Sequence, residues 1–512
     1  MPISKSQEVF NLIKSLSTAE KRNFSLHINR ARSTGDVMFI HLFDILEKRK
    51  TYNEKEVLIE LDNISKNQFS NLKRHLYSQI ISSLRVAHKE KRANFKVREY
   101  LDYAYILYGK GLHLQSLKIL KKARTLASKN HLIYMLLAII EFEKKIESRH
   151  ITRSGSNRAT TLIEKSENIQ KDANHLVALS NLRIQMHAKY LENGHVKNKE
   201  EANEITKYYN QKLDPIDFDN LGLIERIYYV QSLVWYNYIL LDFISCMQYA
   251  KEWVGLFEDH PIMFERDIDL YLRGIHYVLT TAVHLRDYDT HSTYLHKVEA
   301  IRKESYGTFN TNTQIISFLY VHTARLDNIM LSGDFHKSKE VISKSLSRIR
   351  KYKFKLDDHK VMVFYFKFAW IYLGDNNPSK GVIYLNKIIN NELNKLREDL
   401  QDYARILQLI CHYELKNFDL LDYLLKTYSS YFDRKQSINI FLKQAMDMFH
   451  DLKSKGESDH IQVFKKSFST FQTIARDPYE RRALVYLDML SWLDSKIKGI
   501  SLQEIIQRQS KK

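Results

Sequence analysis

Glycine, proline and cysteine are all scarce in this chain of 512 residues, which contains 14 Gly, 5 Pro and 2 Cys. Glycine and proline each fall well below their usual shares of about 7% and 5%, and sharp turns depend on them. Their scarcity favours long helices over strands. The two cysteines, Cys246 and Cys411, lie far apart in the sequence, so they predict neither a disulfide framework nor a cysteine zinc site.

Long apolar runs and targeting signals are also missing. The longest apolar run, Val361 to Leu373, has 13 residues and includes Lys367, whereas a membrane-spanning helix needs about 20. The N-terminus has no basic segment followed by an apolar one, so no signal peptide is predicted. We expect a soluble, cytoplasmic protein that does not enter a membrane.

Motifs for catalysis and cofactor binding are absent as well. The sequence has no Gly-rich phosphate loop, G-x-S-x-G, H-E-x-x-H or C-x-x-C. The densest histidine group is His276, His284, His291 and His296. None of its gaps has the i,i+4 spacing that lets two imidazoles on successive helical turns share a metal. We therefore predict no enzyme, no catalytic residue, no metal and no cofactor, and interpret these histidines as surface or core-edge residues.

What the sequence does contain is a recurring pattern of helix, turn and helix, clearest from Tyr320 to Ser347. Leu326 and Ile329 lie at helical spacing before Gly333, and further apolar residues follow at the same spacing after it. Gly333 is predicted to end the first helix, because glycine takes a left-handed backbone cheaply. A short turn makes the two helices antiparallel. Since one hairpin cannot bury both apolar faces, neighbouring hairpins must stack on it.

Turn markers of this kind recur at nine positions, 39 to 47 residues apart, which gives a period of about 43 residues. They are Gly111, Gly155, Gly194, Leu241, Arg286, Gly333, Gly374, Lys416 and Gly456. The markers without glycine are placed by the Asp-Phe, Asp-Tyr or Asn-Phe pair that follows each of them.

The alternation of small and bulky residues resembles the tetratricopeptide repeat. In the first hairpin it is formed by Tyr103, Ala104, Leu107, Gly111, Ser116, Leu120 and Ala123. The segment from Ala404 to Leu421 is similar to units of uncharacterised bacterial tetratricopeptide proteins. The resemblance implies an all-α fold, a right-handed α-solenoid of antiparallel hairpins whose first helices line a concave face. The period exceeds the 34 residues of that family, so longer helices or looser links are expected.

Three regions are predicted: an N-terminal helical domain over residues 1–92, the repeat array over 93–475, and a C-terminal capping helix with a basic tail over 476–512. Capping boxes in the first region begin at Ser17, Asn53 and Ser65. We expect the closing helix from Arg482 to Ile497, and a frayed tail after it.

The helix pair Glu54–Leu61 and Ser65–His88 has helix-turn-helix proportions. One stripe of its second helix is polar and contains Asn67, Asn71, Arg74 and Arg85. Arginine and asparagine can contact phosphates or base edges, so these four are candidate nucleic-acid-binding residues. The alternative interpretation is a helical cap on the array, because any bundle shows a polar outer face.

Charge and aromatic residues suggest where a partner binds. The net charge is +19, but residues 201–300 have 8 Lys and Arg against 16 Asp and Glu, a net of −8. Within that acidic segment, Trp235, Tyr236 and Tyr238 cannot all point into one core, because consecutive helical residues lie about 100° apart. We predict that at least one faces outward and binds a partner with basic and apolar groups.

Two functions are favoured by the sequence, and an enzyme with an unrecognised site is a third class that it leaves open. The first is a non-catalytic scaffold or adaptor that binds a protein or peptide on its solenoid surface. The second is a regulator with a nucleic-acid-binding N-terminal domain and a sensing solenoid.

Overall fold

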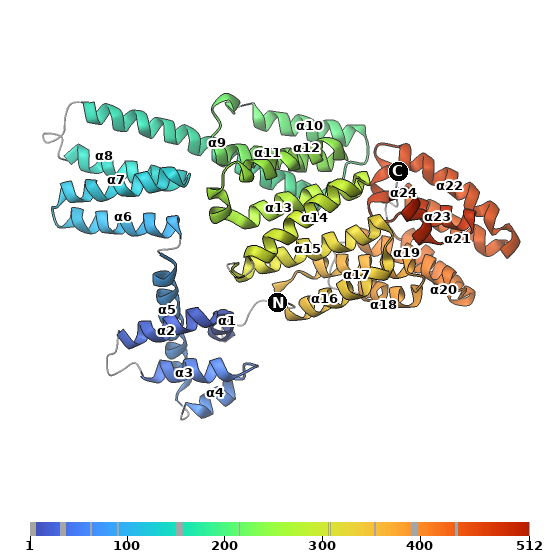
Figure 1. Ribbon diagram of the computed structural model, residues 1–512, viewed down its shortest axis with the longest axis horizontal. Helices are drawn as coiled ribbons and strands as arrows, with labels where there is room; N and C mark the ends of the chain where they lie inside the picture. The colour runs from blue at the N-terminus through green and yellow to red at the C-terminus, as the bar shows by residue number, and fades with distance from the viewer. Residues whose placement is uncertain are drawn as a thin grey trace. The chain divides into compact units, whose positions relative to one another are not determined.

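The computed structural model describes residues 7–30, 37–61, 64–89, 92–149, 157–214, 216–305, 307, 309–352, 355–390, 398–435 and 439–510. Within these ranges the chain consists of helices joined by short turns, with 86% helix and no β-strand (Figure 1). Consecutive helices pack against each other along most of the chain. The predicted all-helical fold class is confirmed.

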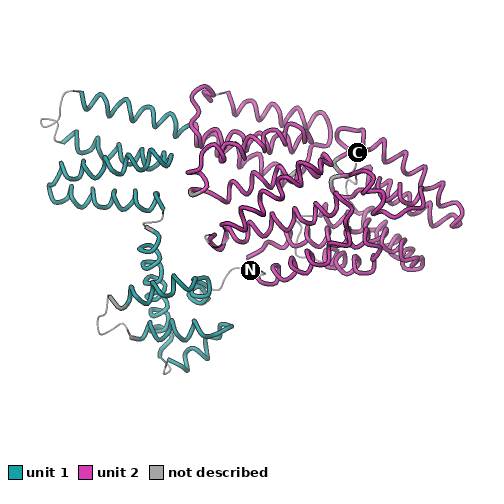
Figure 2. Tube along the Cα trace, in the orientation of Figure 1, with its two compact units in different colours: residues 1–174 teal, residues 175–512 magenta. Residues whose placement is uncertain are grey.

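Two compact units divide the chain, residues 1–174 (unit 1) and 175–512 (unit 2), as Figure 2 shows. The division falls inside one long helix, α9 (Asn157–Asn193), whereas the sequence suggested boundaries after residues 92 and 475. Unit 1 therefore contains the expected N-terminal domain together with the first hairpin, and unit 2 includes the C-terminal helices.

Five helices form the N-terminal part of unit 1. They are α1 (Glu8–Ser15), α2 (Thr18–Arg30), α3 (Val37–Lys48), α4 (Glu54–Glu60) and α5 (Lys66–Lys89). The longest, α5, contacts α1, α2 and α3. Its apolar stripe buries Phe69, Leu76 and Ile80 in a common core with Phe24 and Leu42, as the spacing of these residues predicts.

Two of the three expected capping boxes form completely. The Ser17 amide donates to the Glu20 carboxylate at 2.8 Å, and the Glu20 amide donates back to the Ser17 hydroxyl at 3.3 Å. Ser65 and Gln68 repeat this exchange at 3.0 and 3.3 Å. In the third box, the Asn53 side chain caps the amide of residue 55 and donates to the carboxylate of residue 56.

The remainder of unit 1 begins with three stacked helices. They are α6 (Ala93–Gly109), α7 (His113–Lys129) and α8 (Ile133–Arg149). Ala104 and Ser116 are fully buried where α6 meets α7, and the Ser116 hydroxyl donates to the Ala104 carbonyl at 2.8 Å. Ala123 is also fully buried. The small side chains of the repeat pattern therefore lie at the helix contacts, where they let α6 and α7 approach closely.

The helices of unit 2 alternate between two sets. The first set contains α9, α11 (Leu223–Ile239), α13 (Ile262–Leu285), α15 (Thr311–Ser332), α17 (Asp358–Gly374), α19 (Glu398–Glu414) and α21 (Ile440–Ser454). The second contains α10 (Lys199–Leu213), α12 (Phe243–Glu258), α14 (Tyr288–Ser305), α16 (Ser338–Lys351), α18 (Pro378–Ile389), α20 (Phe418–Asp433) and α22 (His460–Arg476). From α11 onward each first-set helix contacts the second-set helix that follows it, and α13, α15, α17, α19 and α21 also contact one another in that order (Figure 1).

The turns inside these hairpins share a backbone motif. Leu241, Arg286 and Lys416 each follow a first-set helix and have positive φ angles of 61°, 56° and 55°. The next amide then donates to a carbonyl five residues back, as from Asp242 to Asn237 at 3.0 Å. This is the Schellman motif, in which a left-handed residue ends a helix. The three expected turns without glycine are therefore confirmed.

The glycine markers behave in two ways. Those with positive φ are Gly111, Gly194 and Gly333. The turn after α17 instead places Asn376 in the left-handed region, and Gly374 is the last helical residue, where a β-carbon would overlap the Phe335 ring. Gly374 is thus a packing glycine rather than a turn glycine. A turn does occur at Gly456, but with a φ of −69°, and Gly155 lies outside the described residues.

The C-terminal segment differs from the expected single helix and tail. It contains η8 (Glu480–Val485), α23 (Met489–Lys498) and α24 (Leu502–Ser510), and we call residues 480–510 the C-terminal clasp. Leu502, Ile505 and Ile506 are buried, so the tail that we expected to fray is helical as far as Ser510. Residues 511 and 512, which follow Ser510, lie outside the described ranges.

The clasp contacts the turns of several hairpins. A guanidinium nitrogen of Arg481 donates to the Leu241 carbonyl at 2.6 Å, and Arg286 pairs with Asp488 at 2.8 Å. Helix α24 packs against α15. Residues 240 positions apart in sequence are therefore joined within unit 2.

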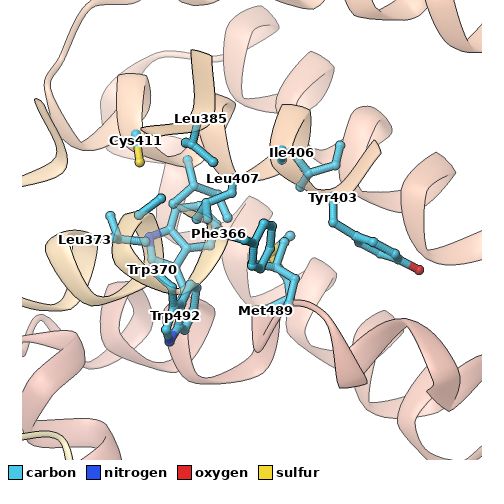
Figure 3. Packing of buried hydrophobic residues seen from close by; sticks show 14 of the residues in the cluster. Phe366, Trp370, Leu373, Leu385, Tyr403, Ile406, Leu407, Cys411, Met489 and Trp492 are labelled. Atoms are coloured by element: carbon cyan, nitrogen blue, oxygen red, sulfur yellow. The ribbon is translucent and has the colours of Figure 1, made fainter. Parts of the chain in front are cut away.

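The largest core cluster of unit 2 includes residues of the clasp. Met489 and Trp492 lie beside Trp370 and Leu407, which come from α17 and α19 (Figure 3). Trp492 is 1% exposed. The clasp is thus part of the folded core.

Candidate binding surface

One face of the first-set helices carries arginine and aromatic side chains, which we call the ladder. Its members are Arg183, His187 and Tyr190 of α9, Tyr228, Gln231 and Trp235 of α11, Arg273 and Tyr277 of α13, and Tyr320 of α15. Within each helix they are three, four or seven residues apart, and that spacing places side chains on one face. Side-chain contacts connect neighbouring helices.

Arg183 links α9 to α11. Its guanidinium lies over the Tyr228 ring, 4.6 Å from the centroid, and donates to the Gln231 side-chain oxygen at 3.0 Å. A guanidinium over an aromatic ring is attracted by the negative face of the ring. Arg183 is half-buried, and this burial lowers its pKa.

Trp235 lies at the centre of the aromatic part of the ladder. Its ring centroid is 4.5 Å from that of His187, and 5.3 Å from those of both Tyr190 and Tyr277. These contacts join α9, α11 and α13, and they fix the indole in one orientation. Trp235 is half-buried, while His187 is exposed. The pair therefore presents a rigid aromatic surface to solvent.

Arg273 connects α13 to α15. It is exposed and interacts electrostatically with Tyr320, whose ring stacks on that of His276 with 4.3 Å between the centroids. Burial acts to lower the pKa of Arg273. The interactions with Tyr320 and Tyr277 act in the opposite direction, and the pKa of Arg273 is raised overall. Arg273 is therefore a permanent cation.

Histidines near the ladder are neutral at pH 7. Burial, followed by the charges of Arg273 and Arg183, lowers the pKa of His187. Burial lowers the pKa of His276 to about 4. The fixed positive charge of this surface comes from the arginines.

The three aromatic residues that the sequence singled out differ in exposure, although the rings of Trp235 and Tyr238 are in contact, with centroids 5.9 Å apart. Trp235 belongs to the ladder. Tyr238 is 8% exposed and lies in the core. The Tyr236 ring stacks on Tyr209 of α10 at 4.3 Å, on another side of α11. The charged ladder residues next to the exposed aromatic surface are Arg183 and Arg273, although the surrounding sequence is acidic. The expected partner with basic and apolar groups stays a prediction.

The polar stripe of α5 is present as a surface. Asn67, Asn71, Arg74 and Arg85 are all exposed. Arg85 forms an ion pair with Asp102 of α6 at 3.0 Å, which neutralises part of its charge. The side chains that the sequence grouped therefore lie on one exposed helix face.

The histidine group around α13 and α14 is dispersed. His276 belongs next to the ladder, His284 lies near Tyr238, His291 is fully buried and His296 is exposed. In the part of the chain that the structure describes, no three His, Cys, Asp or Glu side chains are grouped so as to hold a metal ion. Both cysteines are free and buried, and burial raises the pKa of each thiol.

Arg183, Gln231 and Arg273 were not identified from the sequence. They come from three helices, and nothing in one sequence indicates which faces of distant helices meet. A signal was present in the spacing, because Arg183 and His187 are four residues apart and so are Gln231 and Trp235. Such spacing is common on any helix and becomes specific only once the helices are paired.

Comparison of the chain with protein-family models, curated proteins and solved structures gives no match. None of the helices in the described ranges combines the length and apolar character needed to cross a membrane.

Proposed function

We propose that this chain is a non-catalytic scaffold that binds a protein or peptide partner in the cytoplasm. Its hairpins form a right-handed α-solenoid similar to tetratricopeptide arrays, with the first-set helices on the binding side. The observation that carries this proposal is the ladder, a connected set of arginine and aromatic side chains at the surface of unit 2. The buried free thiols accord with a reducing compartment.

The ladder has the composition of a binding surface. Tryptophan, tyrosine and arginine are the residues that most often dominate interface energies. A ring that is already held by neighbours loses little conformational freedom on binding. Trp235 meets this condition, because four rings contact it while it remains partly exposed. Trp235 is therefore the proposed anchor.

The experiment is site-specific photo-crosslinking in the native cell. A photoreactive amino acid replaces exposed His187, beside Trp235, and crosslinked proteins are identified by mass spectrometry. We expect a specific partner that is lost when Trp235→Ala is added. Tyr423→Ala is the matched control, because Tyr423 is a 64% exposed aromatic residue on the second-set helix α20. Equal crosslinking by the Trp235→Ala and Tyr423→Ala proteins would refute the proposal.

A second candidate function is nucleic-acid binding by unit 1. It is favoured by the exposure of all four polar residues of the α5 stripe. Arginine and asparagine on one face of a helix can contact phosphates and base edges. In this alternative the protein is a regulator whose N-terminal helices bind duplex DNA.

A further inference from the structure

Two buried hydrogen-bond donors of the ladder have no acceptor in the part of the chain that the structure describes. Gln231 is 2% exposed, and its oxygen must face Arg183, because a guanidinium only donates. The amide nitrogen of Gln231 therefore makes no hydrogen bond to Arg183. Neither this nitrogen nor Nε of Arg183 has an acceptor within hydrogen-bonding distance among the described residues. Buried donors are normally paired, so both call for a group that accepts hydrogen bonds.

The positive charge at this place is only partly compensated. Within the described ranges, neither Arg183 nor Arg273 has a carboxylate within 4.0 Å, although ion pairs are common elsewhere. The two cations repel each other, since Arg273 contributes to the lowered pKa of Arg183. Asp267 attracts Arg183, Arg266 and Arg273, and Glu225 also attracts Arg266. Three guanidinium groups therefore face two carboxylates, and an incoming anion would balance the remaining positive charge.

We propose that Arg183, Gln231 and Arg273 form a binding site for the phosphate of a phosphomonoester carried by the partner of the scaffold. This inference rests on the proposed function and identifies the chemistry of the partner. A phosphomonoester has close to two negative charges at pH 7 and three terminal oxygens. These oxygens can accept from both guanidinium groups and from the Gln231 amide. A carboxylate has only two oxygens, and would leave one of these three donor groups without an acceptor.

The surroundings strengthen this recognition. The site lies where protein replaces water around Arg183, and charge-assisted hydrogen bonds are strongest in such places. The ring of Tyr228 lies against the Arg183 guanidinium, with 4.6 Å between the guanidinium carbon and the ring centroid. The half-buried indole of Trp235 lies one helical turn beyond Gln231 on α11. It can contact the organic group to which the phosphate is attached.

Calorimetric titration of the full-length chain tests the proposal with phenyl phosphate, inorganic phosphate and benzoate. We expect phenyl phosphate to bind at least about tenfold more tightly than benzoate, because its three terminal oxygens can accept from both arginines and from Gln231. Inorganic phosphate should bind more weakly than phenyl phosphate, since it lacks a ring. Failure of phenyl phosphate to bind, or equal binding of benzoate, would overturn the phosphate assignment. If inorganic phosphate bound as tightly as phenyl phosphate, the site would recognise free phosphate and not a phosphomonoester carried by a partner.

Variants locate the site. Arg183→Lys keeps the charge but loses the planar fork, and should weaken phenyl phosphate binding about tenfold. Gln231→Glu is nearly isosteric and neutralises Arg183, so it should abolish binding. If the Gln231→Glu protein does not fold, the Arg273→Lys variant is measured in its place, because Arg273 is exposed. Arg226→Lys is the matched control, because Arg226 also lies on α11 but pairs with Glu252 at 3.1 Å. Unchanged affinity in all variants would show binding elsewhere and refute the site.

Different results would refute the scaffold proposal and the phosphate-site proposal. Loss of crosslinking in the Trp235→Ala protein tests the scaffold without reference to phosphate. If that loss occurs and phenyl phosphate does not bind, the scaffold stands and only the phosphate site is refuted. If phenyl phosphate binds and no partner depends on Trp235, the scaffold on this surface is refuted.

Discussion

The indole nitrogen of Trp492 donates a hydrogen bond of 2.7 Å to the carboxylate of Glu414. Lys496, one turn further along α23, binds the other oxygen of the same carboxylate at 2.7 Å. Glu414 is the last residue of α19, immediately before the turn at Lys416. The C-terminal clasp is thus attached to the array by a charged hydrogen-bond pair as well as by apolar packing.

Substitution of Trp492 should separate these two contributions. Trp492→Ala removes a side chain that is 1% exposed and should cost about 3–5 kcal/mol through the cavity it leaves. Trp492→Phe retains much of the packing but loses the hydrogen bond to a charged group, which should cost about 2 kcal/mol. Urea unfolding followed by circular dichroism measures both. An unchanged free energy of unfolding in the Trp492→Phe protein would show that the hydrogen bond to Glu414 does not contribute to stability.

Local features of the fold were predictable because their causes are local. Leu241, Arg286 and Lys416 were placed at turns by the Asp or Asn and the aromatic residue that follow, and each has the left-handed backbone of a helix end. The prediction that Gly374 forms a turn was wrong. Glycine is needed there because the ring of Phe335, from a different hairpin, occupies the space that a β-carbon would take. The ladder was missed for the same reason: it depends on which helix faces meet.

Gly374→Ala tests this distinction. The substitution should destabilise unit 2 by about 1–3 kcal/mol, because the added methyl group overlaps the Phe335 ring. Gly109 is the matched control, since it also ends a helix but has no atom within 4 Å of an added β-carbon. Gly109→Ala should stabilise by about 0.5–1 kcal/mol. Thermal melting compares the two, and stabilisation by both substitutions would contradict the packing role.

Lys416→Gly should stabilise the turn between α19 and α20. Lys416 is exposed and has a φ of 55°, a conformation that costs a residue with a β-carbon about 1 kcal/mol. Glycine avoids this cost, so the melting temperature should rise. Lys416→Val should lower it, because a branched β-carbon makes the left-handed region still less favourable. A higher melting temperature for Lys416→Val than for Lys416→Gly would exclude the left-handed backbone at this position.

His322 should make stability depend on pH. Burial, with the charges of Arg302 and Arg325, lowers its pKa to about 3 in the folded chain, against about 6.5 when unfolded. The neutral form is favoured in the folded state, so its contribution is complete above pH 6.5 and is lost as pH falls. The slope should be about 1.4 kcal/mol per pH unit between about pH 6 and 4.

Replacing His322 tests that slope. The His322 ring nitrogen Nδ1 donates to the Ser345 hydroxyl at 2.8 Å, since that hydroxyl itself donates to the Val341 carbonyl. Asparagine can make the same donation without titrating, so His322→Asn should give a flatter dependence of unfolding free energy on pH. His296→Asn, at an exposed position of α14, is the control. An unchanged slope in His322→Asn would assign the pH dependence to other groups.

The α5 stripe provides the test of the nucleic-acid alternative. If unit 1 binds duplex DNA, Arg74→Ala should weaken binding more than Arg85→Ala, because Arg85 is already paired with Asp102. Each lost phosphate contact should lower the slope of log affinity against log salt by about 1. Asn67→Ala and Asn71→Ala should instead reduce discrimination between DNA sequences, because amides contact bases. Gel shifts at several salt concentrations measure these effects, with Arg226→Ala in unit 2 as control. Absence of binding by the unaltered chain at low salt would remove this alternative and leave the scaffold.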